Sequence, residues 1–325
     1  MSEQKIPSVS TTSQNKLESR SVKGMGTVIT LTVYCKEPKA ILGWLEKKLK
    51  EYEQRFSAND DHSELMAINR AAGQTAVKVH PELFELIQIG KEQSIAAPDL
   101  LNIAIGPLIQ TWRIGFQDAH VPSKEQITRA LSLIDPLAIE LNAAQQSVFL
   151  RKKGMRIDLG ALAKGYIADC LVSELKRKQV KAGLINLGGN VVVFGPCPLH
   201  ADGLWKIGIR DPKGKREECL TILNCSEGSV VTSGIYERVL TLAGHRYTHI
   251  FDSRTGYPVE TDIDSLTIVT KQSLMGEIWT TRLFGYRAEK IQQIMQQKNL
   301  EGVIVKQNGQ VWLSSGAKCA QSAIN

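Results

Sequence analysis

The sequence predicts a single α+β domain with a mixed, largely antiparallel sheet and clustered helices. Helical patterns gather between residues 38 and 113, and extended patterns dominate from residue 184 onward. Strands and helices that are grouped in this way favour an α+β fold over an alternating, doubly wound one. The chain has no internal repeat and no proline-rich linker. Residues 21–325 are therefore expected to form one domain, after a polar, flexible tail over residues 1–20.

The first elements follow from hydrophobic periodicity. Residues 27–34 alternate and are rich in β-branched side chains, which predicts a strand. Residues 38–56 predict a helix, because apolar residues recur at three- and four-residue steps and proline is tolerated in the first turn. A short strand at 154–158 is expected to lead into a helix over 161–175. Further helical segments are predicted at 63–69, 81–96, 102–113, 276–286 and 289–297.

The second half of the chain is mainly extended. The strands predicted there cover residues 184–194, 205–210, 219–224, 229–232, 239–243, 265–270, 301–306 and 311–313. Strands follow one another along most of this half, and the two helical segments at 276–286 and 289–297 lie together between residues 270 and 301. This grouping is typical of antiparallel meanders with clustered helices.

Composition identifies a globular chain, with 42% hydrophobic and 22% charged residues among 325. The net charge of +7 forms no block of like charges and has no interleaved aromatic pattern, so a nucleic-acid binder is not expected. No apolar run reaches the length of a membrane span, and the first residues lack the apolar core of a secretory signal. Six scattered cysteines fit reduced thiols, and a cytoplasmic location is expected.

Two short runs suggest phosphoryl chemistry. Residues 158–166 (DLGALAKGY) place small side chains where a helix is expected to begin, and its unpaired N–H groups suit a phosphate, with Lys164 as an added positive charge. Residues 249–256 (HIFDSRTG) place His249 three residues before Asp252. A histidine titrates near neutrality and can take the proton of an attacking hydroxyl. Asp252 either orients this histidine or serves in its place.

With these segments in view, the chain resembles the ApbE-like FAD:protein FMN transferases from residue 24 to about residue 285. The order and spacing of several motifs carry the resemblance. They are GMGT at 24–27, FS at 56–57 with SEL at 63–65, GPL at 106–108, Trp112 with Gly115, residues 158–166, NLGG at 186–189, Trp205 with GIRDP at 208–212, TSG at 232–234 and residues 246–256.

The resemblance implies a T-fold-like domain and a defined reaction. The FMN part of FAD is transferred to a Thr or Ser hydroxyl of an acceptor flavoprotein, a reductase-like protein, and AMP leaves. Mg²⁺ assists, because charge builds up on the leaving phosphate.

The resemblance also assigns residues. The Mg²⁺ ligands are the main-chain carbonyl of Ala161 and the side chains of Glu277 and Thr281, which lie four residues apart on one expected helix. The FAD contacts are Met25, Ser57, Ala58, Asn59, Asn102, Lys164 and, through its backbone, Ile250. The family usually has aspartate at the positions of Asn102 and Glu277.

Alternatives to transfer remain open at this stage. A FAD pyrophosphatase would let water replace the acceptor hydroxyl and yield FMN and AMP. A non-catalytic relative would bind FAD without turnover, given the changes at Asn102 and Glu277. AMP release with FAD and Mg²⁺ separates the two enzymes from the binding protein, and an added acceptor separates transfer from hydrolysis.

Overall fold

The computed structural model describes residues 14–97, 99–215, 218–236, 238–242, 244–319 and 321–322. Its centre is an eight-stranded sheet in the order β1-β2-β6-β7-β10-β15-β16-β17, in which every neighbouring pair is antiparallel. Its strands are β1 (Lys16–Gly24), β2 (Thr27–Cys35), β6 (Ala182–Leu187), β7 (Asn190–Phe194), β10 (Gly228–Gly234), β15 (Ile263–Thr270), β16 (Glu301–Lys306) and β17 (Val311–Leu313). The predicted α+β class is confirmed.

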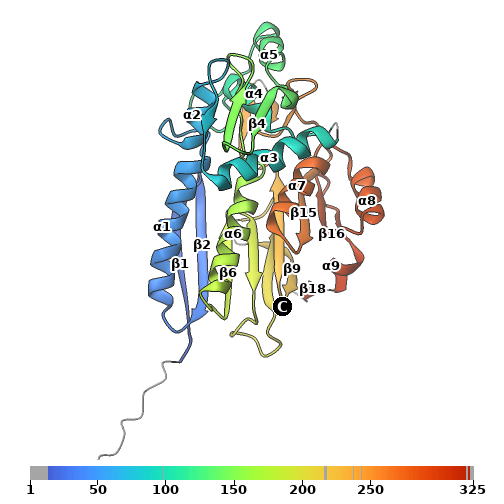
Figure 1. The fold of residues 1–325 in the computed structure, drawn as a ribbon. Helices are drawn as coiled ribbons and strands as arrows, with labels where there is room; N and C mark the ends of the chain where they lie inside the picture. The colour runs from blue at the N-terminus through green and yellow to red at the C-terminus, as the bar shows by residue number, and fades with distance from the viewer. Residues whose placement is uncertain are drawn as a thin grey trace, which may run out of the picture.

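Helices cover one face of this sheet and gather at one of its ends. In Figure 1, α1 and α6 run along the sheet, whereas α2 to α5 lie above it with the small sheet β3-β5-β4. The helices are α1 (Pro38–Phe56), α2 (Glu64–Arg70), α3 (Pro81–Ala96), α4 (Gly106–Trp112), α5 (Lys124–Leu131), α6 (Ala163–Arg177), α7 (Ser273–Leu283), α8 (Ala288–Gln297) and α9 (Ser315–Cys319), with 3₁₀ turns η1 (Ile103–Ile105) and η2 (Pro136–Ala138). Among the residues that the structure describes, none of these helices is long and apolar enough to cross a membrane.

The remaining strands form small sheets around the large one. They are β3 (Val77–Lys78), β4 (Ile139–Asn142), β5 (Ser147–Leu150), β8 (Trp205–Arg210), β9 (Cys219–Cys225), β11 (Val239–Leu242), β12 (His245–Thr248), β13 (Phe251–Asp252), β14 (Tyr257–Pro258) and β18 (Gln321–Ser322). The predicted 239–243 segment matches β11 over residues 239–242, and Ala243 lies outside the described residues.

Alternating side chains divide the core between the two faces of the large sheet. Ile29, Leu31 and Val33 of β2 are fully buried against α1, α3 and α6. On the opposite face, Val193 and Val230 pack with the apolar side chains of β8 and β9. This two-residue alternation is what a sheet covered on both faces requires.

Three predictions about local structure were wrong. The extended segment predicted over 184–194 is two strands, β6 and β7, which turn at Gly188 and Gly189 and pair antiparallel. The flexible tail was expected to reach residue 20, but β1 begins at Lys16 and pairs with β2 over its whole length; residues 1–13 lie outside the described residues. The predicted strand at 154–158 is irregular chain. Its backbone pairs with a side chain instead of a strand: Asn69 Nδ2 donates to the Ile157 carbonyl (3.0 Å), and the Ile157 N–H donates to Asn69 Oδ1 (2.7 Å).

Candidate functional site

Met25 lies at the tip of the β1–β2 hairpin. Gly24 pairs with Thr27, so Met25 and Gly26 form a two-residue turn, and their φ values of 51° and 71° are both left-handed. This is the pattern of a type I′ turn, which favours Asn and Gly. The Met25 N–H donates to Glu53 Oε1 of α1 (2.8 Å), which fixes the turn against the helix.

The loop after α1 carries Ser57, Ala58 and Asn59. Ser57 Oγ accepts the N–H groups of Asn59 (3.2 Å) and Asp60 (3.1 Å), and the Ser57 carbonyl accepts Ser63 Oγ (2.6 Å). Ala58 packs against the main core, whereas Asn59 is exposed. The hydroxyl of Ser57 therefore shapes the loop, and Asn59 is exposed to solvent.

Asn102 caps the 3₁₀ turn η1. Its Oδ1 accepts the Ala104 N–H (2.9 Å), a bond that an aspartate in the same position can also make. The replacement of the usual aspartate thus retains the local fold and removes one negative charge.

The start of α6 has fewer free N–H groups than the sequence suggests. Asp158 Oδ1 accepts the Gly160 N–H (2.8 Å), and the Leu159 carbonyl accepts the N–H groups of Leu162 (2.9 Å) and Ala163 (2.8 Å). The N–H groups of Gly160, Leu162 and Ala163 are therefore already paired within the turn, which shortens the expected row of unpaired donors for a phosphate. Burial raises the pKa of Asp158, while Arg238 and Arg156 oppose the rise.

Glu277 is buried at the contact between α6 and α7. Its side chain is 6% exposed, and its Oε1 accepts Asn190 Nδ2 (2.9 Å) and lies 3.8 Å from Lys164 Nζ. Asn190 in turn accepts Ser273 Oγ on Oδ1 (2.6 Å). This chain of hydrogen bonds fixes the rotamer of a buried carboxylate.

Two further contacts hold α7 beside α6. Asp169 of α6 accepts the N–H groups of Ser273 (2.8 Å) and Leu274 (2.9 Å) at the first turn of α7. A Cβ on Gly165 would lie 2.8 Å from Glu277 Cγ and from Leu274 Cα, so glycine permits the close approach of the helices. Lys164 and Glu277 thus meet because the helices pack closely at Gly165.

The proposed metal ligands fit a hard cation in kind. Glu277, Thr281 and the Ala161 carbonyl offer carboxylate, hydroxyl and carbonyl oxygens, the donors that Mg²⁺ prefers. Within the described part of the chain, no group of three or more His, Cys, Asp or Glu side chains is arranged to hold a metal. A cation here would depend on one acidic side chain plus oxygens from the main chain, a hydroxyl and the substrate.

His249 follows β12, and its Nδ1 lies 3.3 Å from the Arg238 carbonyl oxygen. Burial, Arg238 and Lys164 lower the pKa of His249 to about 4. The imidazole is therefore neutral at pH 7 and stays neutral to well below the pH at which an ordinary histidine becomes charged. A neutral ring can accept a proton.

Asp252 has a different partner. Its carboxylate forms an ion pair with Arg254 (Oδ2 to Nη2, 2.7 Å), which holds the pKa of Asp252 below its usual range. The idea that Asp252 orients His249 is thus not supported by their hydrogen bonds, because Nδ1 of the histidine is directed to Arg238. The neighbouring Ile250 carbonyl accepts the Val259 N–H (2.9 Å), so part of its backbone is already engaged.

Five of the candidate residues, Met25, Asn102, Lys164, His249 and Glu277, lie on segments that contact one another or interact through charge. Lys164 lies beside Glu277, and its charge acts on His249. The Met25 turn reaches the same region through Gly26, where a Cβ would lie 3.0 Å from Arg238 Nη2. The segment of Asn102 is connected to the turn before α6, because the carbonyl of its neighbour Ile103 accepts the Asp158 N–H (2.9 Å).

Sequence reasoning missed three polar residues in this region. Asp158 begins a run that was singled out, and Asn190 directly follows the NLGG run, so motif position could have indicated both. Arg238 is one of 40 Lys and Arg residues, and no local pattern distinguishes it.

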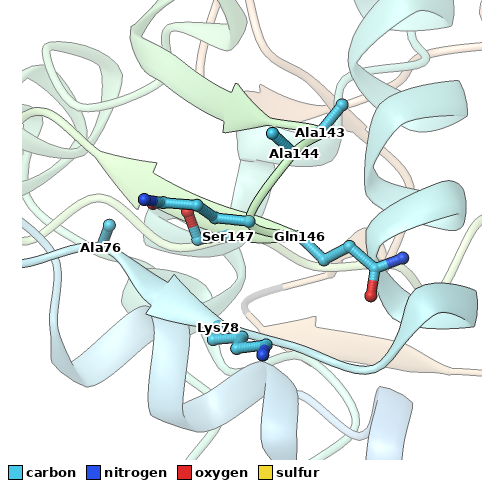
Figure 2. A pocket seen from close by; sticks show the side chains of 7 residues that line it. Ala76, Lys78, Ala143, Ala144, Gln146 and Ser147 are labelled. Atoms are coloured by element: carbon cyan, nitrogen blue, oxygen red, sulfur yellow. The ribbon is translucent and has the colours of Figure 1, made fainter.

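A separate pocket lies on the small sheet of the helical end. Figure 2 shows it between β3 and the β4–β5 turn, lined by Ala76, Lys78 and residues 143–147. None of the candidate residues lines this pocket, and alanine and glutamine supply most of its lining residues.

Known proteins resemble this chain over most of its length. The model of the ApbE family matches residues 25–304. A Klebsiella pneumoniae protein named FAD:protein FMN transferase is 40% identical over 304 residues, 93% of each chain. A Treponema pallidum protein of the same name is 35% identical over 287 residues, 84% of this chain and 79% of that protein. The ApbE protein of Thermotoga maritima has a TM-score of 0.85 at 26% identity, covering 95% of this chain and 100% of its own.

Proposed function

Because this chain belongs to the ApbE family, we propose that it is a FAD:protein FMN transferase. A Thr or Ser oxygen of the acceptor attacks the FMN phosphorus, the pyrophosphate bond to AMP breaks, and AMP leaves with the bridging oxygen. The hydroxyl proton passes to a base. The observation that carries the proposal is the buried Glu277 carboxylate beside Lys164, whose charge also acts on His249, in a chain similar to a named transferase.

His249 is the proposed base, with Asp252 as the alternative. In its neutral form His249 can take the proton of the attacking hydroxyl. The two phosphates of FAD bring negative charge, which favours the protonated ring and raises its pKa from the low value in the free protein. The bound substrate would therefore strengthen the base when it is needed.

Lys164 is the proposed phosphate contact. Its Nζ lies 3.8 Å from Glu277 Oε1, within ion-pair distance but too far for a short hydrogen bond. The remaining proposed FAD contacts are Met25, Ser57, Ala58, Asn59, Asn102 and Ile250. Met25 offers a thioether to a ring system, and Asn102 retains an amide N–H₂ after capping η1.

Glu277, Thr281 and the Ala161 carbonyl are the proposed Mg²⁺ ligands. When bound, the cation would neutralise charge on the pyrophosphate. The longer side chain of Glu277, compared with the usual aspartate, is proposed to be compensated by a small displacement of its helix, and Asn190 donates a hydrogen bond to the carboxylate. The acceptor is proposed to be a reductase-like flavoprotein with a Thr or Ser site, and the cytoplasmic location stays a prediction that cell fractionation tests.

Substitution of Glu277 tests this function. Glu277→Gln is expected to abolish Mg²⁺-dependent AMP release from FAD, because an amide cannot replace the anionic oxygen, yet it can keep the bond from Asn190 and hence the fold. Glu277→Asp is expected to retain activity. AMP is followed by chromatography during Mg²⁺ titration of all three proteins.

The same assay distinguishes the alternative activities. AMP with free FMN in the presence of a reductase-like acceptor indicates a pyrophosphatase, whereas FMN attached to the acceptor, seen as added mass, indicates transfer. FAD binding without AMP indicates a non-catalytic relative. Wild-type magnesium dependence in the Glu277→Gln protein contradicts the proposed metal site.

A further inference from the structure

Arg238 lies where three separate segments meet. It immediately precedes β11, on the hairpin that leads to His249. A Cβ on Gly115 would lie 2.7 Å from Arg238 Cδ, and a Cβ on Gly26 would lie 3.0 Å from its Nη2. The arginine side chain therefore crosses two glycine turns that leave room for it.

The main chain of Arg238 also determines the proton position on His249. Nδ1 of the ring is 3.3 Å from the Arg238 carbonyl oxygen. A carbonyl only accepts hydrogen bonds, so Nδ1 must be the protonated nitrogen. In a neutral imidazole the other nitrogen, Nε2, then has the free lone pair.

The guanidinium of Arg238 keeps its positive charge close to His249. Of the described carboxylates, Asp158 is the one whose pKa the charge of Arg238 lowers, and no ion pair at contact distance joins the two side chains. The charged groups that act on His249 in this part of the chain are Arg238 and Lys164. Burial makes the largest contribution to the low pKa of His249, and Arg238 makes the next largest.

We propose that Arg238 is a positioning residue for His249. Its carbonyl fixes the ring proton on Nδ1, and its guanidinium, lying across Gly26 and Gly115, keeps Nε2 free to accept a proton. This inference rests on the proposed role of His249 as the base and adds the residue that prepares it. Since the arginine is exposed, salt should weaken its effect.

An NMR titration tests the proposal without any turnover. The protein is labelled with ¹⁵N-histidine, and the His249 signals are assigned by their loss in His249→Gln. We expect wild-type His249 to titrate near pH 4 with a protonated Nδ1. Arg238→Gln should raise the pKa by about one unit or more, a tenfold change in proton affinity, while burial keeps it below the ordinary value. Arg238→Lys should shift it less, because the charge remains.

Arg177→Gln is the matched control. It removes the same charge from the last turn of α6, thirteen residues from Lys164 and thus about 20 Å along the helix. We expect no change in the His249 titration. An unchanged His249 pKa in Arg238→Gln, or a proton-free Nδ1 in the wild type, overturns the proposal. A melting curve of each variant identifies loss of folding.

The pH dependence of AMP release gives a second readout. The acidic limb of kcat/KM for FAD reports the free-enzyme base, so it should lie at higher pH in Arg238→Gln than in the wild type. The difference between the two proteins should shrink at high salt, because screening of Arg238 moves the wild-type limb upward. If His249→Gln remains fully active, His249 is not the base, and Asp252 takes its place in the proposed function. The NMR result on Arg238 stands independently of that outcome.

Discussion

At the scale of single residues, one of the positions with left-handed backbone is a candidate site residue. Met25 has a φ of 51°, a conformation that costs a residue with a Cβ about 1 kcal/mol or more. A type I′ turn is satisfied more easily by Asn or Gly. The hydrogen bond from its N–H to Glu53 holds the turn in place. A methionine retained under such strain is consistent with a role for its side chain in binding.

Met25→Asn is therefore expected to stabilise the fold and weaken FAD binding. The free energy of unfolding should rise by about 0.5–1 kcal/mol, since asparagine tolerates the left-handed region better. The dissociation constant for FAD should rise severalfold, because the thioether contact is lost. Urea unfolding and flavin fluorescence titration measure the two effects.

Gln146→Asn provides the control for this prediction. Gln146 has a φ of 50° in the β4–β5 turn, which carries none of the candidate residues. It should give a similar gain in stability with unchanged FAD affinity. Equal FAD affinity in the Met25→Asn protein would remove Met25 from the binding site.

At the scale of elements, the contact between α6 and α7 determines where Lys164 and Glu277 meet. Gly165 allows the two helices to approach, and Asp169 accepts two N–H groups at the start of α7. Burial raises the pKa of Asp169, and these two hydrogen bonds oppose the rise. The position of the buried carboxylate is thus a property of the helix pair.

Gly165→Ala should separate these helices. The new Cβ would lie 2.8 Å from backbone and side-chain atoms of α7, so the protein should lose about 1–3 kcal/mol of unfolding free energy, and Mg²⁺-dependent AMP release should fall. Gly43→Ala in α1 is the matched control, because a Cβ at that position would meet no atom within 4 Å. It should gain about 0.5–1 kcal/mol and keep its activity. Urea unfolding and the AMP assay compare both proteins, and a Gly165→Ala protein with wild-type stability and activity contradicts the role of this close contact.

Elements with a strong local pattern could be predicted from the sequence. The helix Pro38–Phe56 matches its predicted bounds, because its apolar spacing and first-turn proline are local signals. The segment 154–158 was predicted wrongly, since its partner is the side chain of Asn69, 88 residues away from Ile157. β1 has a polar sequence and becomes a strand by pairing with β2.

Sequence motifs were sufficient to choose the candidate residues, but they could not predict which residues these side chains contact. The hydrogen bond from Asn190 to Glu277 spans 87 residues, and the placement of Arg238 depends on two glycines in distant turns. Such contacts are set by tertiary packing, which no local pattern contains. The tautomer of His249 likewise depends on a carbonyl eleven residues away.

At the scale of the whole molecule, a buried ion pair joins the helical end to the sheet layer. Asp99, in the segment after α3, lies 3.3 Å from Arg282 of α7, and their side chains are 9% and 14% exposed. Burial raises the pKa of Asp99, and Arg282 opposes the rise. Arg282 also donates to the Gln93 carbonyl (2.8 Å). The segment that carries Asn102 is thereby tied to the helix that carries Glu277 and Thr281.

Asp99→Asn should destabilise the protein strongly. It leaves Arg282 buried without its counter-charge, which typically costs about 3–5 kcal/mol. Asp118→Asn removes an exposed partner of Arg113 and should cost less than about 1 kcal/mol. Urea midpoints of the two variants give the comparison, and equal midpoints would show that the Asp99 pair does not join the two regions energetically.

The two edge strands of the large sheet disfavour pairing with a strand of another protein. β1, at one edge, carries Lys16, Glu18, Arg20 and Lys23, and β17, at the other, has three residues. Charged or very short edge strands discourage the addition of a foreign strand. The protein should therefore resist edge-to-edge aggregation at high concentration. An acceptor protein is accordingly expected to dock on the loops around His249 and Met25, and not to extend the sheet.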